Sequence, residues 1–355
     1  MKRKTKKARK GPVKKDLYGA VDLHGDNGLY CLINERDERV FQQRLPNELQ
    51  TVLQALEPYK ERLVGGLAVE STFNWYWLVD GLQDHGYEMQ LVNTTKVQTY
   101  SGLKQSNDKT DAFWLAHLKR LGVLPTGYIY PRAQRGARDL LRRRMLLVQQ
   151  RTAHVLSFKS LVARETGDHV SANTVKGLED REVEQWVSGE AAVLMGQTNV
   201  RVIECLDEQI GRLEKAAKAQ LKLLPDYRCL QQIPGVGEIL NLVIMLETGP
   251  IERFAGAGNY VSYCRAVRAE KISNERKKGE NNRKCGNKYL AWAWVEAANF
   301  ALRYRPEIKR WYQRKVKRCG GKTVVALKAV AAKLAKAAYY MLKNQEAFKR
   351  EQVFG

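Results

Sequence analysis

The sequence contains no apolar run that approaches the length of a membrane-spanning helix. Its first fifteen residues are basic, but they lack the apolar stretch that a secretory signal peptide needs. A transmembrane protein and an exported protein are therefore disfavoured, and we expect a cytoplasmic protein. A membrane-surface role is also disfavoured, because no basic amphipathic helix with a clean apolar face stands alone at a terminus.

The cysteines form no C-x-x-C pair, which excludes a recognisable zinc ribbon or zinc finger. They are scattered along the chain, and reduced thiols fit this distribution better than a disulfide framework. The six residues are Cys31, Cys205, Cys229, Cys264, Cys285 and Cys319.

Acidic residues are few compared with basic ones. The chain has 61 Lys and Arg against 38 Asp and Glu, and its formal net charge at pH 7 is +23. This excess favours a polyanionic partner, since each neutralised phosphate releases counterions and adds affinity. Residues 1–16 are predicted to be a disordered basic tail that touches nucleic acid. A solubilising tail on an enzyme that is merely basic remains the alternative.

The region from residue 17 to 132 alternates predicted strands and helices. Buried strands are predicted at 18–22, 29–34, 39–45, 63–69 and 88–93. Helices are predicted at 46–59, at 74–85 and from residue 108 onward. Three antiparallel strands followed by alternating helices and strands are the order of a ribonuclease-H-like (RuvC-like) α/β domain.

The rest of the chain is predicted to be mainly helical, which makes the fold class α/β plus α. Residues 133–224 have apolar residues at helical spacing among Arg, Leu, Glu and Lys, with long helices expected over 133–164 and 199–224. We interpret this region as a helical hairpin or coiled coil that is a candidate dimerisation arm. A compact helical domain is expected over 225–345, with a last helix at 323–343 and a short tail at 346–355.

Four carboxylates stand out by their positions. Asp22 ends the first predicted strand and Glu70 ends the fourth, while Asp108 and Asp111 share one face at the start of a helix. In the predicted fold these positions converge, which is unfavourable unless cations neutralise the charge. One or two Mg²⁺ ions suit such a cluster and would polarise a scissile phosphate. Alternatively, these acids are turn and helix-cap residues.

Two further acids compete for this assignment. Asp26 lies in the turn after the first strand and Asp80 lies in a predicted helix, and we interpret both as structural.

A basic segment at residues 265–288 surrounds Ser273. Because it has few large apolar residues, we interpret it as a loop or irregular turn. A serine among cations is poised against a phosphate, and the cations would stabilise a deprotonated hydroxyl and a pentavalent transition state. Alternatively, Ser273 only donates a hydrogen bond to a bound phosphate. The expected phosphate-binding residues are Arg265, Arg268, Arg276, Lys277, Lys278, Arg283, Lys284 and Lys288.

The segment Ile233-Pro-Gly-Val-Gly237 is predicted to be a turn between helices. It resembles the hairpin of helix–hairpin–helix DNA-binding elements, so the amides of Gly235 and Gly237 are candidates for contacts with a phosphate backbone.

Several short motifs occur in a specific order along the chain. In the N-terminal part they are Gly19-Ala-Val-Asp22 with His24, Ala68-Val-Glu70-Ser-Thr, and Asn107-Asp108-Lys-Thr-Asp111-Ala112 followed by Trp-Leu-Ala. In the C-terminal part they are Ile233-Pro-Gly-Val-Gly237, Glu247-Thr-Gly-Pro-Ile-Glu-Arg253-Phe254, Tyr263, Ser273, Gly286-Asn287, Tyr289-Leu290 and Glu296-Ala-Ala298.

Over about residues 17–343, these motifs resemble the IS-one-ten family of insertion-sequence transposases, including its IS-eleven-eleven subgroup. One departure concerns the serine segment. The family often has two glycines directly after the serine, whereas this chain has Ser273-Asn274-Glu275. Ser273 keeps the expected distance to Gly286-Asn287 and is chosen over Ser262, which lies in an apolar helical stretch.

The resemblance implies a DNA recombinase that excises and inserts its element through a serine-linked DNA intermediate. Asp22, Glu70, Asp108 and Asp111 would act with Ser273 in a composite site between subunits of a homodimer or homotetramer. The resemblance also implies that a non-coding bridge RNA pairs with donor and target DNA and supplies the sequence choice. A nucleoid-associated protein is expected.

Two other functions stay open at this point. A Holliday-junction resolvase-like nuclease would use the same four acids with water as the nucleophile. A non-catalytic RNA-binding protein would bind without Mg²⁺ and cleave no strand, but the presence of all four acids argues against it.

Overall fold

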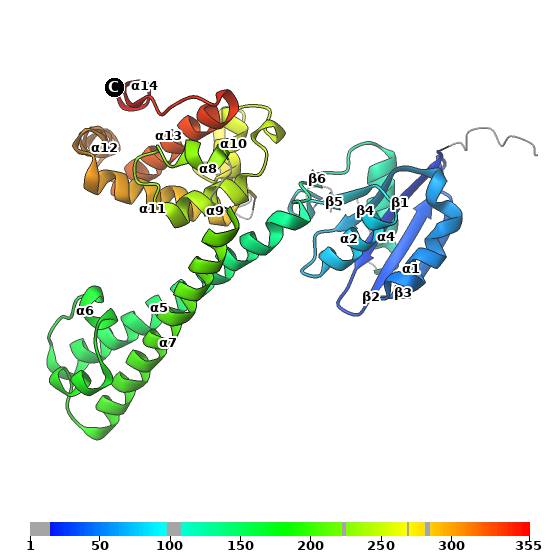
Figure 1. The fold of residues 1–355 in the computed structure, drawn as a ribbon. Coiled ribbons are helices and arrows are strands. Elements are labelled where there is room, and N and C mark those ends of the chain that lie inside the picture. The colour runs from blue at the N-terminus through cyan, green and yellow to red at the C-terminus, as the bar shows by residue number, and fades with distance from the viewer. Residues whose placement is uncertain (1–14, 98–107, 222–224, 268–269, 281–284) are drawn as a thin grey trace, which may run out of the picture. The chain divides into compact units, whose positions relative to one another are not determined.

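The computed structural model describes residues 15–97, 108–221, 225–267, 270–280 and 285–355 (Figure 1). Of residues 108–110, 221, 270–273, 277, 279–280 and 350 it describes the backbone only. The chain divides into two compact units, Met1–Tyr130 and Pro131–Gly355. We describe each unit by itself.

The N-terminal unit is built on a six-stranded sheet with the order β3-β2-β1-β4-β5-β6. β1, β2 and β3 are antiparallel neighbours, β1, β4 and β5 run parallel, and β6 pairs antiparallel with β5. The prediction of an α/β domain is confirmed, and the mixed sheet is consistent with a ribonuclease-H-like transposase domain. The strands are β1 (Leu17–Leu23), β2 (Asn27–Ile33), β3 (Arg39–Pro46), β4 (Leu63–Glu70), β5 (Met89–Val92) and β6 (Thr126–Gly127).

Helices cover both faces of this sheet because its central strands are apolar on both sides. Residues such as Val21 and Leu67 pack with α1 (Leu49–Leu56) and α2 (Trp75–Asp84). On the other face, Ala20 and Ala68 pack with α4 (Asp108–Arg120). The helix predicted over 46–59 is shorter than expected, since α1 passes into a 3-10 helix, η1 (Glu57–Arg62), that has Pro58 in its first turn. A short helix, α3 (Thr94–Val97), follows β5.

Polar contacts fix the C-terminal half of α4. Lys119 is buried and donates to the main-chain oxygens of Gly65, at 3.1 Å, and Gly66 at the start of β4. In the same turn of the helix, His117 and Arg120 bind Asp37 in the turn between β2 and β3. Burial alone would raise the pKa of Asp37, but the hydrogen bonds from His117 and Arg120 hold it below its usual value. These contacts set the position of α4 along the strands.

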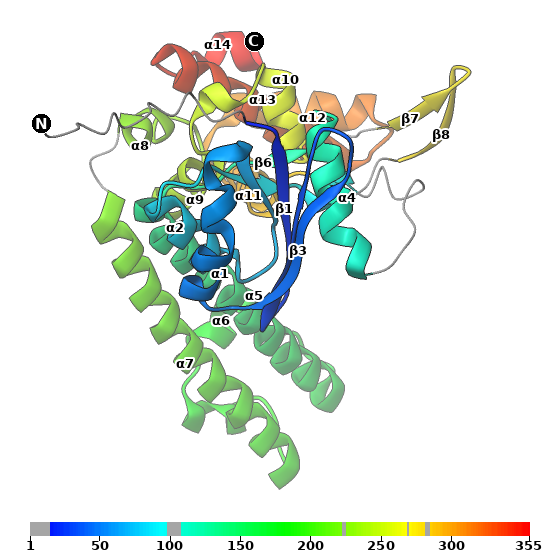
Figure 2. The same cartoon turned by 90° about the vertical axis from the view of Figure 1, so that its right-hand side faces the viewer.

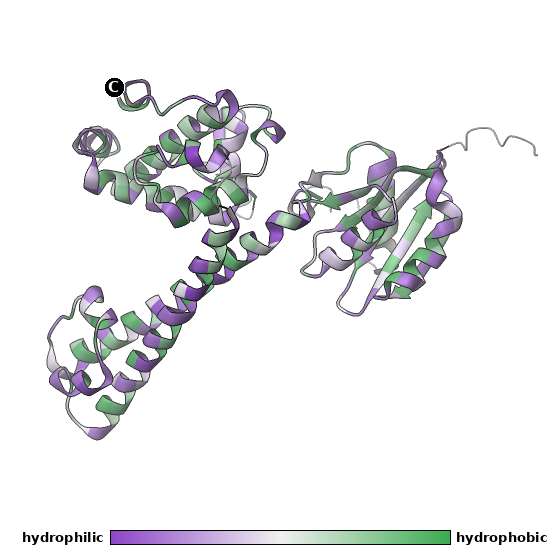
Figure 3. Cartoon of the chain, in the orientation of Figure 1, coloured by the Kyte–Doolittle hydropathy of each residue, from purple (hydrophilic) through white to green (hydrophobic). Residues whose placement is uncertain are grey.

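The second unit begins with a helical arm. α5 (Arg132–Thr166) and α7 (Glu190–Leu221) run side by side, and polar and apolar residues alternate along both (Figures 1 and 3). At one end they enclose a separate small core with Phe158, Val183 and Ile203, to which α6 (Ala172–Lys176) and η3 (Asp180–Gln185) contribute. The helix predicted from residue 199 starts nine residues earlier, at Glu190. The coiled-coil geometry of the arm and its role in dimerisation stay predictions.

The rest of this unit is a helical bundle with one large apolar core, in which Tyr260, Trp294 and Leu334 are fully buried. No helix in the part of the chain that the structure describes is long and apolar enough to cross a membrane. The elements are α8 (Pro225–Leu230), α9 (Glu238–Thr248), η4 (Ile251–Arg253), α10 (Ala257–Tyr263), β7 (Glu270–Ser273), β8 (Arg276–Glu280), α11 (Lys288–Tyr304), α12 (Pro306–Arg318), α13 (Thr323–Asn344) and α14 (Arg350–Phe354).

The burial of Lys119 gives a prediction about pH. Burial lowers the pKa of Lys119 from 10.5 to about 8, although the charge of Glu88 opposes this shift. Between these two values the unfolded chain binds a proton at this lysine that the folded chain does not, so stability rises with pH in this window. A shift of this size corresponds to about 3 kcal/mol.

We therefore expect the free energy of unfolding of the unaltered protein, relative to Lys119→Met, to rise between about pH 8 and 10.5. Urea unfolding at a series of pH values measures this difference. Parallel stability curves for the two proteins would contradict the assignment.

Candidate active site

Two of the four predicted acids lie on one face at one edge of the sheet. β1 and β4 are parallel, and Val21 is level with Val69, so Asp22 and Glu70 follow at the same level. Successive strand residues point to opposite faces. Because Ala20 and Ala68 face α4, Asp22 and Glu70 face the same side. Asp22 is 5% exposed and Glu70 is half-buried.

α4 brings its first turn to the same edge. Lys119 binds the first residues of β4, so the helix runs antiparallel to this strand. From Lys119 back to Asp111 the helix rises about 12 Å, at 1.5 Å per residue. From Gly66 to Glu70 the strand advances about 13 Å, at 3.3 Å per residue. Asp111 is thus level with Glu70, while Asp108 begins α4 with its side chain outside the described residues.

The loops that follow β1 and β4 are joined by hydrogen bonds beside this edge. The Nδ2 amide of Asn74, which precedes α2, donates to the main-chain oxygen of His24 at 2.7 Å. The Thr72 hydroxyl donates to Asn74 Oδ1 at 2.9 Å, which orients the amide. The His24 side chain lies with its Nε2 3.3 Å from Asp22 Oδ2. The sequence analysis missed Asn74 because its partner is 50 residues away.

The residues at this edge suit a divalent cation of the magnesium type. The four predicted ligands are all carboxylates, and Mg²⁺ prefers oxygen ligands, of which one or two carboxylates are commonly sufficient. One oxygen of Asp111, Oδ1, is shielded from solvent. Among the side chains that the structure describes, which exclude that of Asp108, no three acidic, histidine or cysteine groups already form a metal site. Asp22, Glu70 and Asp111 are among these side chains, so the structure does not bring the three together as a metal site, and their joint use with Asp108 belongs to the proposal below.

The competing acids lie elsewhere. Asp26 is exposed in the turn after β1, where its Oδ1 accepts from Asn27 at 2.7 Å. Asp80 is half-buried in the middle of α2. Neither stands at a strand end beside α4, in agreement with a structural role.

The segment around Ser273 differs from the prediction. We expected a loop or irregular turn, but residues 270–280 form a two-stranded antiparallel hairpin of β7 and β8, which projects from the helices of this unit (Figure 2). Ser273 is the last residue of β7 and is paired with Arg276. The prediction failed because Ile272 is the one large apolar residue in the sequence of residues 270–280, so no alternation of apolar and polar residues marks the strands.

The turn of this hairpin explains the missing glycine pair. Asn274 and Glu275 have positive φ angles of 50° and 61°. Two central residues with positive φ are the requirement of a type I′ turn, which matches the twist of two-residue hairpins. Glycine adopts this conformation without strain, asparagine tolerates it, and glutamate does not favour it. The chain therefore keeps the backbone that two glycines would favour, with strain concentrated at Glu275.

The predicted phosphate-binding cations of residues 265–288 are described only in part. Arg276, Lys278 and Lys288 are exposed, and only the backbone of Lys277 is described. Arg265 is half-buried and donates to the main-chain oxygen of Gly286 at 3.0 Å, which ties together the two ends of the segment. Arg268, Arg283 and Lys284 lie outside the described residues.

The predicted turn at residues 233–237 does join two helices, α8 and α9. Gly235 has a φ of +82°, and a Cβ there would lie 2.0 Å from the main-chain oxygen of Ala297 in α11. Close packing on α11 thus accounts for glycine at this position. Gly237 is exposed at the N-cap of α9 and stays a candidate for a phosphate contact.

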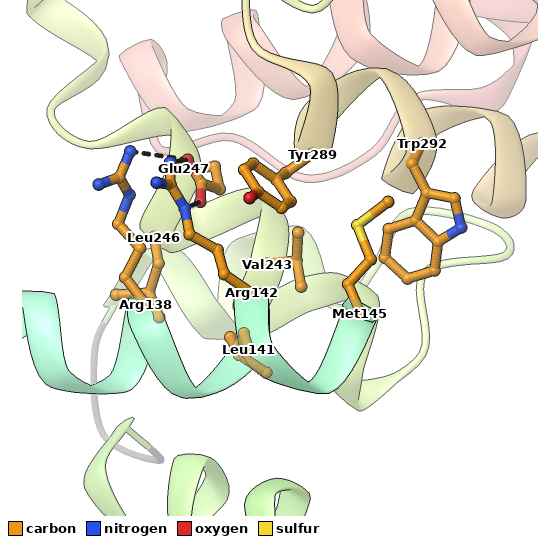
Figure 4. Close-up of a pocket in the computed structure, with 9 residues that line it drawn as sticks. All are labelled: Arg138, Leu141, Arg142, Met145, Val243, Leu246, Glu247, Tyr289 and Trp292. Atoms are coloured by element: carbon orange, nitrogen blue, oxygen red, sulfur yellow. Dashed lines mark hydrogen bonds and ion pairs between the residues drawn. The ribbon is translucent and has the colours of Figure 1, made fainter. Parts of the chain in front are cut away.

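A buried carboxylate in the second unit, Glu247, was missed as a site residue (Figure 4). Glu247 of α9 is 3% exposed at its side chain and binds two arginines of the arm helix α5. Arg142 donates two hydrogen bonds to Glu247, at 2.6 and 2.9 Å, and Arg138 donates one at 3.0 Å. Asn287 adds a fourth donor at 2.7 Å. Its Oδ1 accepts from Tyr289 and Leu290 and so caps α11.

This cluster connects the arm to the end of the serine segment. The main-chain nitrogen of Asn287 donates to Tyr263 at 2.7 Å, so Glu247 holds the residue where the chain returns from the hairpin. The ring of Tyr289 lies under the Arg142 guanidinium, 4.4 Å from its carbon. Burial alone would raise the pKa of Glu247, but Arg142, Arg138 and Asn287 keep it below its usual value.

Removal of the Glu247 charge is expected to destabilise this unit. Glu247→Gln leaves two guanidiniums beside a neutral amide, and breaking a buried ion pair in this way costs about 3–5 kcal/mol. The matched control is Glu252→Gln, which removes an exposed carboxylate of the same unit and should stay within about 0.5 kcal/mol. Urea unfolding at neutral pH measures both variants.

The loss of unfolding free energy caused by Glu247→Gln should become smaller in acid. Since the folded-state pKa of Glu247 is lowered from 4.5, its contribution is present above this value and lost as the pH falls through the folded pKa. Equal stabilities of Glu247→Gln and Glu252→Gln at neutral pH would show that the cluster does not support the fold.

The strained turn gives a second prediction. Glu275→Gly should relieve about 1 kcal/mol of strain and slow hydrogen exchange of the β7 and β8 amides about five-fold. Glu275→Ala is the control, because alanine keeps a Cβ at a positive φ and should bring no comparable slowing. Exchange rates that are equal in Glu275→Gly and Glu275→Ala would argue against a type I′ turn.

Two family models match the chain and cover both candidate regions. A model of the DEDD IS110 type, described as a transposase, matches residues 20–165, which contain Asp22, Glu70, Asp108 and Asp111. A second, described as the transposase IS116/IS110/IS902 family, matches residues 227–313, which contain Glu247 and Ser273. No curated protein matches the chain. The chain therefore carries the transposase domains of the IS110 family, the IS-one-ten family of the resemblance above, and is a DNA transposase, an enzyme that acts through DNA cleavage and rejoining.

Proposed function

We propose that this transposase excises and inserts its insertion sequence by strand exchange through a phosphoserine intermediate. The observation that carries this proposal is the edge of the sheet where Asp22, Glu70 and the first turn of α4 are level. This edge gathers negative charge that would bind metal. The net charge of +23 on the protein as a whole would attract the phosphates of DNA toward it.

Asp22, Glu70, Asp108 and Asp111 would hold one or two Mg²⁺ ions. When bound, the ions polarise the scissile phosphate and neutralise the charge that develops on its oxygens. The protein supplies rigid ligands: Asp22 and Glu70 extend from paired strands, and the contacts of Lys119 and Asp37 fix α4. A ligand set placed by strands and a locked helix is better defined than one on loops.

Ser273 is the proposed nucleophile. Its hydroxyl oxygen would attack the scissile phosphorus, forming a bond from serine to the 5′-phosphate while the bond to the 3′-oxygen breaks. The 3′-oxygen leaves as a hydroxyl that takes up the proton lost by Ser273. Arg276, Lys277 and Lys278 directly follow the turn, where their charges would stabilise the phosphate as it becomes pentavalent.

Rejoining reverses this step with a different 3′-hydroxyl. Because the phosphate remains esterified throughout, no hydrolysis of the backbone is needed. The two candidate regions would meet over one phosphodiester, in a composite site formed between subunits of a homodimer or homotetramer. A bridge RNA that pairs with donor and target DNA would supply the choice of sequence, since no base-reading module is evident in the chain.

Substitution of the serine tests the mechanism. With Mg²⁺, the bridge RNA and a junction DNA, Ser273→Ala should form no covalent protein–DNA adduct on denaturing gels and no recombinant product. Ser262→Ala is the matched control, since Ser262 is an exposed serine of the same unit, and it should retain both. Binding of the DNA should be unchanged in either variant.

Two outcomes would overturn parts of this proposal. Recombination retained by Ser273→Ala removes the serine from the mechanism. Free 5′-phosphate ends without any adduct indicate a nuclease that uses water, as in a resolvase. Asp22→Asn should abolish cleavage in either case, which separates failure of the acidic site from failure of the serine.

A further inference from the structure

We propose that the outer face of α12 binds the phosphate backbone of duplex DNA, independently of the serine hairpin. The face consists of Lys309, Arg310, Arg314, Lys317 and Arg318, and we call it the α12 surface. It lies in the most basic part of the described chain outside the hairpin, because residues 303–322 contain nine Lys or Arg and one acid, Glu307.

The helix that carries this face is anchored by its other side. Ile308 is fully buried in the core of the bundle, and Trp311 packs against it. The Trp311 ring lies 5.7 Å from that of Phe354 in α14, and Lys333 of α13 lies over it at 5.2 Å. Proline in the first turn and two positive-φ glycines after Cys319 define the ends of the helix. The cations are therefore held on a rigid element.

The five cations of the α12 surface are all exposed. No ion pair joins any of them to a carboxylate in the part of the chain that the structure describes. Other cations of the same unit are neutralised: Arg144 binds Glu214 at 2.8 Å, and Arg138 and Arg142 bind Glu247. Several arginines of the arm are thus paired with carboxylates, whereas the described ion pairs leave the charge of α12 available to a partner.

The spacing of three of these cations suits a nucleic-acid backbone. Arg310, Arg314 and Lys317 are four and three residues apart, on one side of the helix. They line a groove in which Glu307 is the one acidic side chain and Tyr312 also takes part. Over seven residues the helix rises about 10 Å. One strand of DNA carries a phosphate about every 3.4 Å of its axis, so the three cations can reach about three phosphates.

Duplex DNA is the occupant that the observations favour. The chain is a DNA transposase, so DNA is a polyanion that it must hold whatever its nucleophile is. The surface offers five long flexible cations, whereas the two aromatic residues of α12, Trp311 and Tyr312, are both half-buried. This composition fits a backbone contact without base readout better than the stacking of unpaired bases. The inference rests on the DNA substrate and not on Ser273 or Mg²⁺.

The test measures binding of the full-length protein to a fluorescent duplex of about 30 base pairs at several salt concentrations, without Mg²⁺ so that no strand is cut. Arg310→Gln/Arg314→Gln/Lys317→Gln should reduce the magnitude of the slope of log K against log salt by about 3, one per lost phosphate contact. At about 100 mM salt, DNA binding should weaken at least about ten-fold.

The matched control removes three exposed cations of the arm, as Lys176→Gln/Arg212→Gln/Lys215→Gln. It loses the same total charge, so its slope should change by less than about 1 if the α12 surface is a specific contact. Equal changes in the two triple variants would mean that only overall charge matters, and would overturn the proposal. An unchanged slope in the α12 variant would do the same.

Two further measurements keep the result interpretable. Arg314→Gln alone should lower the magnitude of the slope by about 1. This variant replaces the triple variant if circular dichroism shows that the triple variant does not fold.

A duplex RNA and a single-stranded RNA of equal length are tested in the same way. Loss of RNA binding with unchanged DNA binding would assign the surface to RNA and contradict the inference. Recombination retained by Ser273→Ala would overturn the serine mechanism and leave this result untouched, so the two proposals fail separately.

Discussion

Carboxylates that share one face at the edge of a sheet repel one another, and the N-terminal unit has to hold them together by contacts made elsewhere. Asp22 and Glu70 follow apolar strand residues that are fully buried, so the sheet sets the positions of their backbones. α4 is fixed at its far end, where Lys119 binds β4 near its start. The buried strands and the contacts of Lys119 thus set the backbone positions of the acids from outside the charged edge.

How much of this arrangement the sequence predicts depends on the range of the interactions. Four of the five predicted strands were found because apolar runs mark them, and the strand ends that carry acids follow directly. β3 is largely exposed and was predicted as the next strand of the antiparallel meander. The position of α4 along the strands could not be predicted, since it depends on the contact of Lys119 with Gly65, which is 54 residues away in the sequence. The same holds for Glu247, whose partner Arg138 is 109 residues away. Local patterns in the sequence do not predict contacts between residues so far apart.

The hairpin shows a different limit of sequence reasoning. Its strands are short and polar, so its existence depends on the turn and on the contacts at its base. Asn274 and Glu275 stand where two glycines would be favoured, and both have positive φ angles. The backbone of this turn is therefore formed without the residues that favour it most. A motif defined by glycines alone misses this turn, whereas one defined by the required φ angles finds it.

The proposed chemistry sets a demand that this hairpin can meet. In a water-using nuclease the nucleophile arrives by diffusion, so only the metal ligands need to be fixed. A serine that is esterified and later released must approach the acidic edge and then give way to a 3′-hydroxyl at the same phosphorus. An element with a fixed base and an extended tip suits this sequence of events. The base is held by Glu247 through Asn287 and by Arg265 at Gly286, while Ser273 lies at the tip. The same contacts connect the hairpin to α5, so the arm helix and the serine segment share one buried carboxylate and are positioned together.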